Sequence, residues 1–275
     1  KKTEKLIKFF KKHDNLVIVD SDKTKDVIVM NKDQYIEKLK NVFSDRSKFT
    51  KLKNNPLKKD LIEYRKLLYL VKPYMTKHQF LKLDPNQSLK KGYIKIKTHK
   101  EDWGERPIIS SVSSMTGPAE TYIFKIIKPL ISECEFSIAS TKEFNSKFHN
   151  IQSKFDPNLH EVASWDIKSM YSNINIDKVT SYIIDKIYIK PENYFTETET
   201  DPNTGKNIKK IIPKNIFRKF LKKILTEFSG FTTLDGFYKQ KSGLSMGGKL
   251  SAPLSNIYIH MLESDVIKNI LNLEI

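Results

Sequence analysis

The chain has 275 residues and carries 49 lysines and arginines against 32 aspartates and glutamates, a formal net charge of +17. This length is sufficient for one domain with a large hydrophobic core. The single cysteine, Cys134, excludes a disulfide framework and a cysteine-based zinc site, and it is typical of a reducing compartment. The sequence contains no run of about 18 apolar residues and no amino-terminal signal pattern, so we expect a soluble protein without a membrane partner.

Positive charge is concentrated in the first third of the chain. Residues 1–100 contain 27 basic and 11 acidic residues, whereas the remaining 175 residues contain 22 basic and 21 acidic ones. Such a concentration indicates a surface that faces a polyanion, and nucleic acid is the leading candidate. One alternative is a lysine-rich composition on solvated helix faces. A membrane surface is disfavoured, because the basic segments are not single amphipathic helices beside an apolar anchor.

The first third is expected to alternate helices and strands. Residues 1–13 predict a basic helix, and the apolar runs 16–19 and 27–30, joined by a polar turn, predict a β-hairpin. Apolar residues at helical spacing then predict helices over 35–43 and 57–71.

A second hairpin is predicted by residues 93–100 and 106–111, in which apolar and basic residues alternate. Lys95, Lys97 and Arg106 are expected to share its cationic face. Such a face suits a triphosphate, because lysine supplies a point charge and arginine a bidentate fork. An edge hairpin that lysines protect against aggregation explains the same pattern equally well.

In the middle of the chain, Asp166 is expected to lie at the end of a strand. After a core helix over 118–133, the alternation in residues 161–168 predicts a short strand with Asp166 at its end. The helix that follows, with apolar residues over 179–187, is expected to begin at Asp177 as its N-cap. An aspartate at a strand end is more often a cap or turn residue, so this pattern alone indicates little.

The last third contains three predictable segments and a glycine loop. Residues 194–210 predict an exposed hairpin or insertion, 216–228 a core helix, and 231–240 a hairpin around an Asp-Gly turn. A loop with three glycines, between Gly243 and Gly248, then opens a helix and allows close approach of another backbone or of a flat base and sugar. The phosphate-loop spacing Gly-x-x-x-x-Gly-Lys-Ser/Thr is not met, so nucleotide hydrolysis of that kind is not supported.

Four stretches in this order resemble motifs of one family, the reverse transcriptases, and most closely those of Penelope-like elements, which are relatives of telomerase. The stretches are 15–30, 97–111, 166–174 and 237–253. Any one of these stretches alone would be weak evidence for the family. Four of them, in the right order and at appropriate separations, argue against a coincidental match. The resemblance covers nearly the whole chain.

The resemblance implies an α+β, right-hand polymerase fold, with fingers plus a partial palm of antiparallel sheet and packed helices. Residues 1–90 would be a basic N-terminal extension and 91–157 the fingers. Residues 158–275 would be a partial palm that holds the first two palm motifs, with an insertion at 190–212.

The resemblance also implies the chemistry. Asp166 would be the catalytic carboxylate and would bind two Mg²⁺ ions, or Mn²⁺, while the carbonyl of Ile167 would help to hold the ion beside the nucleotide. In such sites two metals activate the primer 3′-hydroxyl and stabilise the departing pyrophosphate.

Further roles follow from the same resemblance. Tyr171 would pack under the incoming sugar and exclude a 2′-hydroxyl, although an aromatic residue at this place often only packs. The expected nucleotide-binding residues are Lys97, Arg106, Lys168, Tyr171, Gln240 and Gly247. The expected nucleic-acid-binding residues are Lys95, His99, Lys100, Gly243 and Lys249.

The sequence departs from the family pattern at several places. Gly248 and Lys249 stand where Ser-Pro is usual, and Asn175 replaces a common proline. The third palm motif, which carries the second catalytic carboxylate pair, does not occur before Ile275. We therefore expect a chain cut at both ends, which is inactive on its own.

The leading functional hypothesis is an RNA-directed DNA polymerase of a Penelope-like retroelement that takes an RNA template, a DNA primer and deoxynucleoside triphosphates, in an intracellular, nuclear setting. The competing hypothesis is a catalytically inactive RNA-binding protein derived from a reverse transcriptase. An RNA-templated RNA polymerase is disfavoured by Tyr171, where a smaller or polar residue would be expected.

Overall fold

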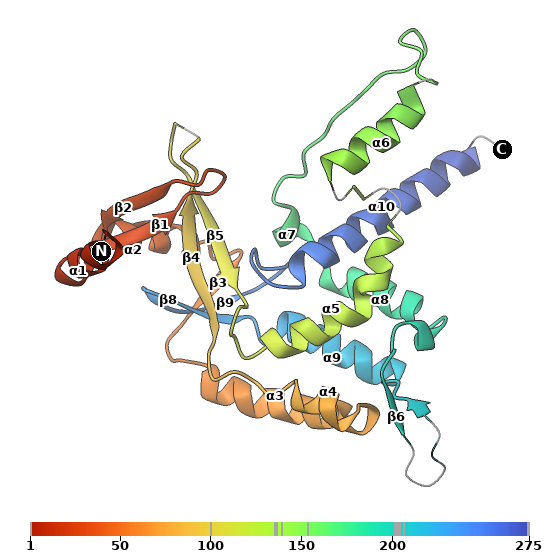
Figure 1. The fold of residues 1–275 in the computed structure, drawn as a ribbon, viewed down its shortest axis with the longest axis horizontal. Coiled ribbons are helices and arrows are strands. Elements are labelled where there is room, and N and C mark those ends of the chain that lie inside the picture. Colours follow the sequence, from red (N-terminus) through yellow and green to blue (C-terminus); the bar gives the residue numbers. More distant parts are fainter. Residues whose placement is uncertain are drawn as a thin grey trace.

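A computed structural model describes the chain except at residues 1, 100, 135, 136, 139, 153, 201–204, 206, 274 and 275. A five-stranded sheet lies beside a body of packed helices (Figure 1). The expected mixture of helices and sheet is therefore confirmed, although the sheet is mixed rather than purely antiparallel. None of the helices in the described part is long and apolar enough to cross a membrane.

The sheet has the strand order β3-β9-β8-β4-β5. Its strands are β3 (Phe49–Leu52), β4 (Lys90–Ile96), β5 (Glu105–Ser110), β8 (Gly230–Thr233) and β9 (Gly236–Gln240). The β4–β5 and β8–β9 pairs are two of the predicted hairpins, and β3 pairs antiparallel with β9. A parallel pairing of β4 with β8 joins the two hairpins into one sheet.

The N-terminal part packs against this sheet. It consists of α1 (Lys2–Lys12), the hairpin β1 (Leu16–Asp20) and β2 (Val27–Asn31), and α2 (Lys32–Phe43), as the sequence predicts. Helix α2 buries a stripe of apolar side chains against the sheet in a small core of its own. The buried members of that core are Val19, Tyr35, Leu39, Phe43, Phe49, Ile94, Ile96, Ile109, Phe231 and Tyr238.

The helical body holds the larger core. It is formed by α3 (Leu57–Val71), α5 (Gly117–Ser132), α8 (Ile176–Ile187), α9 (Lys214–Thr226) and α10 (Ser251–Leu273). Each predicted apolar face is buried here, because residues three and four apart lie on one side of a helix. One core thus spans the three sequence segments assigned to extension, fingers and palm, and that division stays a prediction.

Several short elements complete the fold. They are η1 (Lys72–Tyr74), α4 (Lys77–Leu81), α6 (Thr141–Gln152), α7 (Met170–Asn173), η2 (Pro191–Asn193), β6 (Thr198–Thr200) and β7 (Asn207–Lys209). The β6–β7 pair is the exposed hairpin that the sequence predicts. Strand β3 and helices α4 and α6 were not predicted.

The strand predicted to present Asp166 is wrong. Residues 161–167 have no regular structure, and the side chains of Val162 and Trp165 are 80% and 87% exposed. A strand satisfies its backbone N–H and C=O groups through a neighbouring strand. No strand in the described residues pairs with this segment, so the alternating pattern has nothing to pack against.

The predicted N-cap of α8 is also wrong. The cap is Asn175, whose side chain accepts a hydrogen bond from the backbone N–H of Lys178 at 3.0 Å. Asp177 lies inside the first turn, where a negative charge favours the positive end of the helix dipole without capping it. Asparagine and aspartate are equally good caps, so the sequence alone could not decide between the two positions.

Candidate nucleotide and nucleic-acid site

The glycine loop between β9 and α10 packs directly on α7. Gly243 has φ +65°, and a Cβ placed there would lie 2.5 Å from the carbonyl oxygen of Ser172 and 2.6 Å from that of Tyr171. The backbone N–H of Leu244 donates to the Tyr171 oxygen at 2.8 Å. Only glycine combines this left-handed conformation with so close a backbone approach.

The other end of the same loop packs on β5. Gly247 has φ +98°, and a Cβ there would lie 2.9 Å from Cγ2 of Ile108. The backbone N–H of Ile109 donates to the oxygen of Met246 at 2.6 Å. The loop therefore brings the segment after Asp166 and the segment after Arg106 together, although they are far apart in the sequence.

A buried ion pair contacts the residue that follows the glycine loop. Lys90 Nζ lies 3.1 Å from Oε1 of Glu120, and the two side chains are 9% and 4% exposed. Glu120 also accepts hydrogen bonds from Thr116 Oγ1 at 2.8 Å and from the backbone N–H of Lys249 at 3.1 Å. Burial alone would raise the pKa of Glu120, but the charge of Lys90 and hydrogen bonds from Ser111 and Thr116 hold it below its usual value. The carboxylate thus stays ionised and ties the glycine loop to α5.

Sequence reasoning missed Glu120. Its only signal is a carboxylate on an apolar helix face, in register with Ile123 and Ile127 at three and seven residues. Carboxylates are almost never fully buried unless they are paired, so a charged residue on a core-facing stripe predicts a buried partner. The identity of that partner, Lys90, depends on tertiary packing.

The predicted cationic face of the β4–β5 hairpin is present. Lys95 and Arg106 are direct cross-strand partners and so share one face of the sheet. Lys97 follows at the end of β4 with the same alternation, whereas Ile94 and Ile96 on the opposite face are 1% and 0% exposed. The hairpin therefore gathers three of the predicted phosphate-binding cations.

Arg106 is not free on that face. Its Nη1 lies 3.1 Å from Oδ1 of Asp22, whose side chain is 3% exposed. The backbone N–H of Asp22 donates to the oxygen of Ile96 at 2.8 Å, which docks the turn of the N-terminal hairpin onto the end of β4. Within the described residues, the Oδ2 atom of Asp22 is buried without a hydrogen-bond partner.

The predicted metal-binding segment stands apart from these contacts. Asp166 and Ile167 lie in the exposed irregular stretch, and the carbonyl of Lys168 accepts a hydrogen bond from Asn173 Nδ2 at 3.1 Å. Among the described residues there is no group of three or more histidines, cysteines, aspartates or glutamates that could hold a metal. Because Mg²⁺ requires near-octahedral oxygen coordination, Asp166 alone does not make a magnesium site.

Tyr171 and Gln240 both have contacts at or next to Gly243. The ring of Tyr171 is half-buried and packs against the larger core, and Gln240 Nε2 donates to the carbonyl of Ser242 at 2.8 Å. His99 is exposed in the turn after β4, and Lys100 lies outside the described residues.

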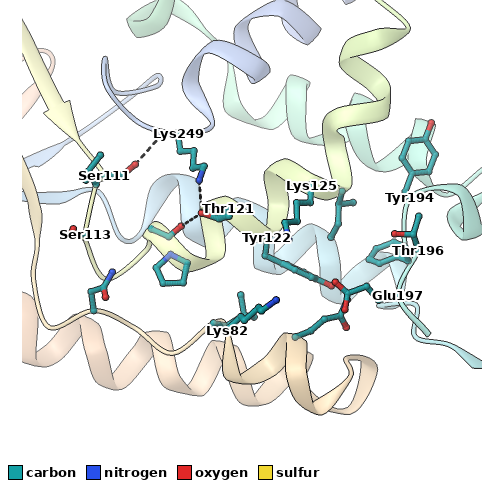
Figure 2. Close-up of a pocket in the computed structure, with 18 of the residues that line it drawn as sticks. Lys82, Ser111, Ser113, Thr121, Tyr122, Lys125, Tyr194, Thr196, Glu197 and Lys249 are labelled. Carbon is teal, nitrogen blue, oxygen red and sulfur yellow. Dashed lines mark hydrogen bonds between the residues drawn. The ribbon is translucent and has the colours of Figure 1, made fainter. Parts of the chain in front are cut away.

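A pocket of about 760 Å³ opens beside the glycine loop (Figure 2). It lies between α4, the turn after β5, the first half of α5 and the segment 194–197. Lys82, Lys125 and Lys249 supply positive charge to its lining, and the Nζ atom of Lys249 donates to Thr121 Oγ1 at 2.9 Å. The volume is within the range of about 300–1,000 Å³ that is usual for ligand pockets.

Aromatic side chains line the far side of this pocket. Tyr122 and Tyr194 belong to the lining, and Glu197 lies beside the Tyr122 ring in Figure 2. Burial, followed by the charge of Glu197, raises the pKa of Tyr122, so its hydroxyl stays protonated as a donor. Cations together with aromatic faces are the means by which proteins hold single-stranded nucleic acid. Lys82, Tyr122 and Lys125 were not predicted, because only the fold brings them to Lys249.

No protein-family model and no curated protein sequence matches the chain. Solved structures that share its fold include two telomerases. Telomerase from Candida tropicalis, in an apo form truncated from the C-terminal domain, is 12% identical with a TM-score of 0.54, and the match covers 91% of this chain and 48% of that one. Telomerase from Candida albicans, in complex with a TWJ fragment of telomeric RNA, is 11% identical with a TM-score of 0.52, covering 94% of this chain and 43% of that one. The chain therefore spans less than half the length of these telomerases and shares the fold of that part.

Proposed function

We propose that this chain is the fingers and partial palm of an RNA-directed DNA polymerase, a reverse transcriptase of the Penelope-like type. The observation that carries the proposal is the glycine loop, which packs Gly243 on Tyr171 and Gly247 on Ile108. Three of the four family-like stretches thereby meet at one place. The telomerase fold of the chain supports the same class.

In this account the cationic hairpin takes the triphosphate. Lys95, Lys97 and Arg106 stand on one face, and phosphate is the ligand that such a face suits best. Tyr171, whose backbone contacts Gly243, and Gln240 would contact the sugar and base of the incoming deoxynucleotide. Lys168 would add charge from the segment before α7.

The 760 Å³ pocket takes the RNA strand in this account. Gly247 and Lys249 belong both to the glycine loop and to the pocket lining, so a strand held there would run directly to the nucleotide site. The lysines offset the phosphate charge, and the tyrosines offer stacking surfaces.

Asp166 is proposed as one ligand of the catalytic Mg²⁺ ions. When bound, such ions activate the primer hydroxyl and stabilise the leaving pyrophosphate. Among the described residues, Asp166 belongs to no group of three or more histidines, cysteines, aspartates or glutamates that could hold a metal ion. We therefore propose no nucleotidyl transfer by these residues alone.

The competing function is RNA binding without catalysis, and the isolated position of Asp166 is the observation in its favour. A test is Tyr171→Ala in the protein expressed from the complete natural coding sequence. A reverse transcriptase should then accept ribonucleotides while still incorporating deoxynucleotides. Unchanged sugar selectivity would place Tyr171 in the core, and RNA binding with no extension by the parent protein would favour the competing function.

A further inference from the structure

A second basic pocket, of about 460 Å³, lies between α2, β3 and the β8–β9 turn. It shares no lining residue with the 760 Å³ pocket. Its charged lining residues are Lys40, Arg46, Lys51, Lys241 and Asp235. Four cations against one carboxylate leave an excess of three positive charges in a concave site.

Asp235 holds two of these cations in place. Its side chain is 8% exposed, and Lys51 Nζ lies 2.6 Å and Lys40 Nζ 3.8 Å from its oxygens. Tyr238 donates its hydroxyl to the same carboxylate. Burial alone would raise the pKa of Asp235, but hydrogen bonds from Lys51 and Tyr238 hold it below its usual value. The ionised carboxylate therefore orders both lysines, whose side chains are still 58% and 56% exposed.

The other two cations are positioned by the backbone. The N–H of Lys241 donates to the oxygen of Lys48 at 2.8 Å, and Lys241 Nζ donates to the oxygen of Arg46. These contacts fasten the turn before β3 to the end of β9. The backbone of Arg46, a lining residue of the pocket, is thereby held beside Lys241.

The inner wall of this pocket is apolar. Phe43, Phe49 and Tyr238 line it, and each is less than 8% exposed. An apolar wall lowers the local dielectric constant, so an anion in the pocket is attracted more strongly than on an open surface. The rings are too deeply buried to stack on a base, which leaves charge as the means of recognition.

We propose that this pocket binds a phosphate group of an RNA backbone, outside the nucleotide and template sites described above. Lysine ammonium groups and an arginine fork are the usual partners of phosphate. The choice of RNA as the source of that phosphate rests on the proposed function. Edge protection of β3 explains Lys51 but not Lys40 on α2 or Arg46 in the turn, since neither lies on the edge strand.

The test compares two double variants of the 275-residue chain. Lys40→Gln with Arg46→Gln removes two pocket cations and keeps Lys51, which pairs with the buried Asp235. Arg65→Gln with Lys219→Gln is the matched control, because both residues are exposed on helices and line neither pocket. Binding of a single-stranded RNA 12-mer is measured by fluorescence anisotropy over a salt series.

Loss of one phosphate contact should lower the slope of log affinity against log salt by about 0.7–0.9. At about 0.1 M salt this corresponds to RNA binding that is about five- to tenfold weaker in the pocket variant. The control variant, Arg65→Gln with Lys219→Gln, should show the same salt dependence of RNA affinity as the parent chain. Equal losses in the two variants, or no loss in the pocket variant, would overturn the phosphate site while leaving RNA binding by the parent intact. A parent chain that binds no RNA would contradict both the site and the proposed function.

Experiments with inorganic phosphate distinguish an RNA phosphate from a free phosphate compound as the ligand of this pocket. If RNA is the ligand, phosphate at millimolar concentration should compete with RNA only weakly in the parent chain. Tight binding of inorganic phosphate to the parent chain, measured by isothermal titration and lost in the Lys40→Gln, Arg46→Gln variant while both proteins bind RNA equally, would assign the pocket to a free phosphate compound and overturn RNA as its ligand.

Discussion

Arg106 on the cationic hairpin forms an ion pair with the buried carboxylate of Asp22 at 3.1 Å. The pair joins the turn of the N-terminal hairpin to the strand that is expected to face the triphosphate. A ligand phosphate at this face would therefore compete with Asp22 for the same guanidinium group. The N-terminal hairpin is thus in a position to set the affinity of the proposed nucleotide site.

Asp22→Asn should strengthen binding of a deoxynucleoside triphosphate to the chain. The substitution removes the charge that neutralises Arg106, and we expect a gain of about three- to tenfold, equivalent to about 0.7–1.4 kcal/mol. Isothermal titration at low salt measures it, with a thermal melt to show that the variant is folded. The control is Asp20→Asn, an exposed carboxylate of the same hairpin. An affinity that is unchanged or lower in Asp22→Asn would mean that Arg106 does not contact the ligand.

Gly243→Ala should destabilise the chain by about 2–5 kcal/mol, because a left-handed conformation costs about 1–2 kcal/mol and an added methyl group in a close contact about 1–3 kcal/mol. Gly205→Ala is a matched control, since Gly205 has nearly the same φ of +66° but no neighbour from the described part of the chain within 4 Å of its Cβ position. Urea unfolding measures both variants. Equal losses would show that the approach of the loop to Tyr171 contributes nothing beyond backbone strain.

Glu120→Gln should lower the free energy of unfolding by about 3–5 kcal/mol at neutral pH, because it leaves Lys90 buried without its partner charge. Glu63→Gln removes an exposed partner of Lys66 and should cost no more than about 1 kcal/mol.

The pH dependence provides a second readout for Glu120. The folded-state pKa of Glu120 lies below the ordinary value of 4.5. Its contribution is therefore fully present above pH 4.5 and is lost as the pH falls through the lower folded-state pKa. The parent chain should lose stability in that window, and Glu120→Gln should lose less. Parallel pH profiles would contradict the buried ion pair.

Lys82→Gln with Lys125→Gln should weaken binding of a single-stranded RNA 12-mer and lower its salt slope by about one to two, since each lysine is expected to offset one phosphate in the 760 Å³ pocket. Lys58→Gln with Lys128→Gln removes the same charge from exposed positions outside that pocket. Equal effects of the two pairs would indicate general attraction rather than a binding site. Deleting residues 1–90 is not a usable alternative, because Tyr64 and Leu83 belong to the core.

Sequence patterns correctly predicted the helices and hairpins that neighbouring residues determine. The Asp235-Gly236 turn fixed the β8–β9 hairpin, and helical spacing located the core faces of α5, α8 and α9. Residues 161–168 carry an equally good strand pattern, but strand formation needs a partner that local sequence does not supply. Strand β3 was missed for the converse reason: four residues with only Phe49 buried form a strand because β9 lies beside them.

The candidate site also combines features that local sequence predicts with features that depend on distant residues. The glycine spacing predicted a close backbone approach, and the structure identifies Tyr171 and Ile108 as the neighbours. The charged partners Asp22, Lys90 and Glu120 come from distant parts of the chain, and no short motif marks them. Pairings of this kind depend on topology, which periodicity does not encode.

Primer extension on an RNA template tests the central claim most directly. The protein is expressed from the complete natural coding sequence, with Asp166→Asn as the variant of equal shape and Asp156→Asn as a control at a half-buried carboxylate outside the predicted site. A reverse transcriptase should extend a DNA primer with deoxynucleotides, lose most of that activity in Asp166→Asn while it keeps its RNA affinity, and retain it in Asp156→Asn. RNA binding without extension, or extension that survives Asp166→Asn, would contradict the account.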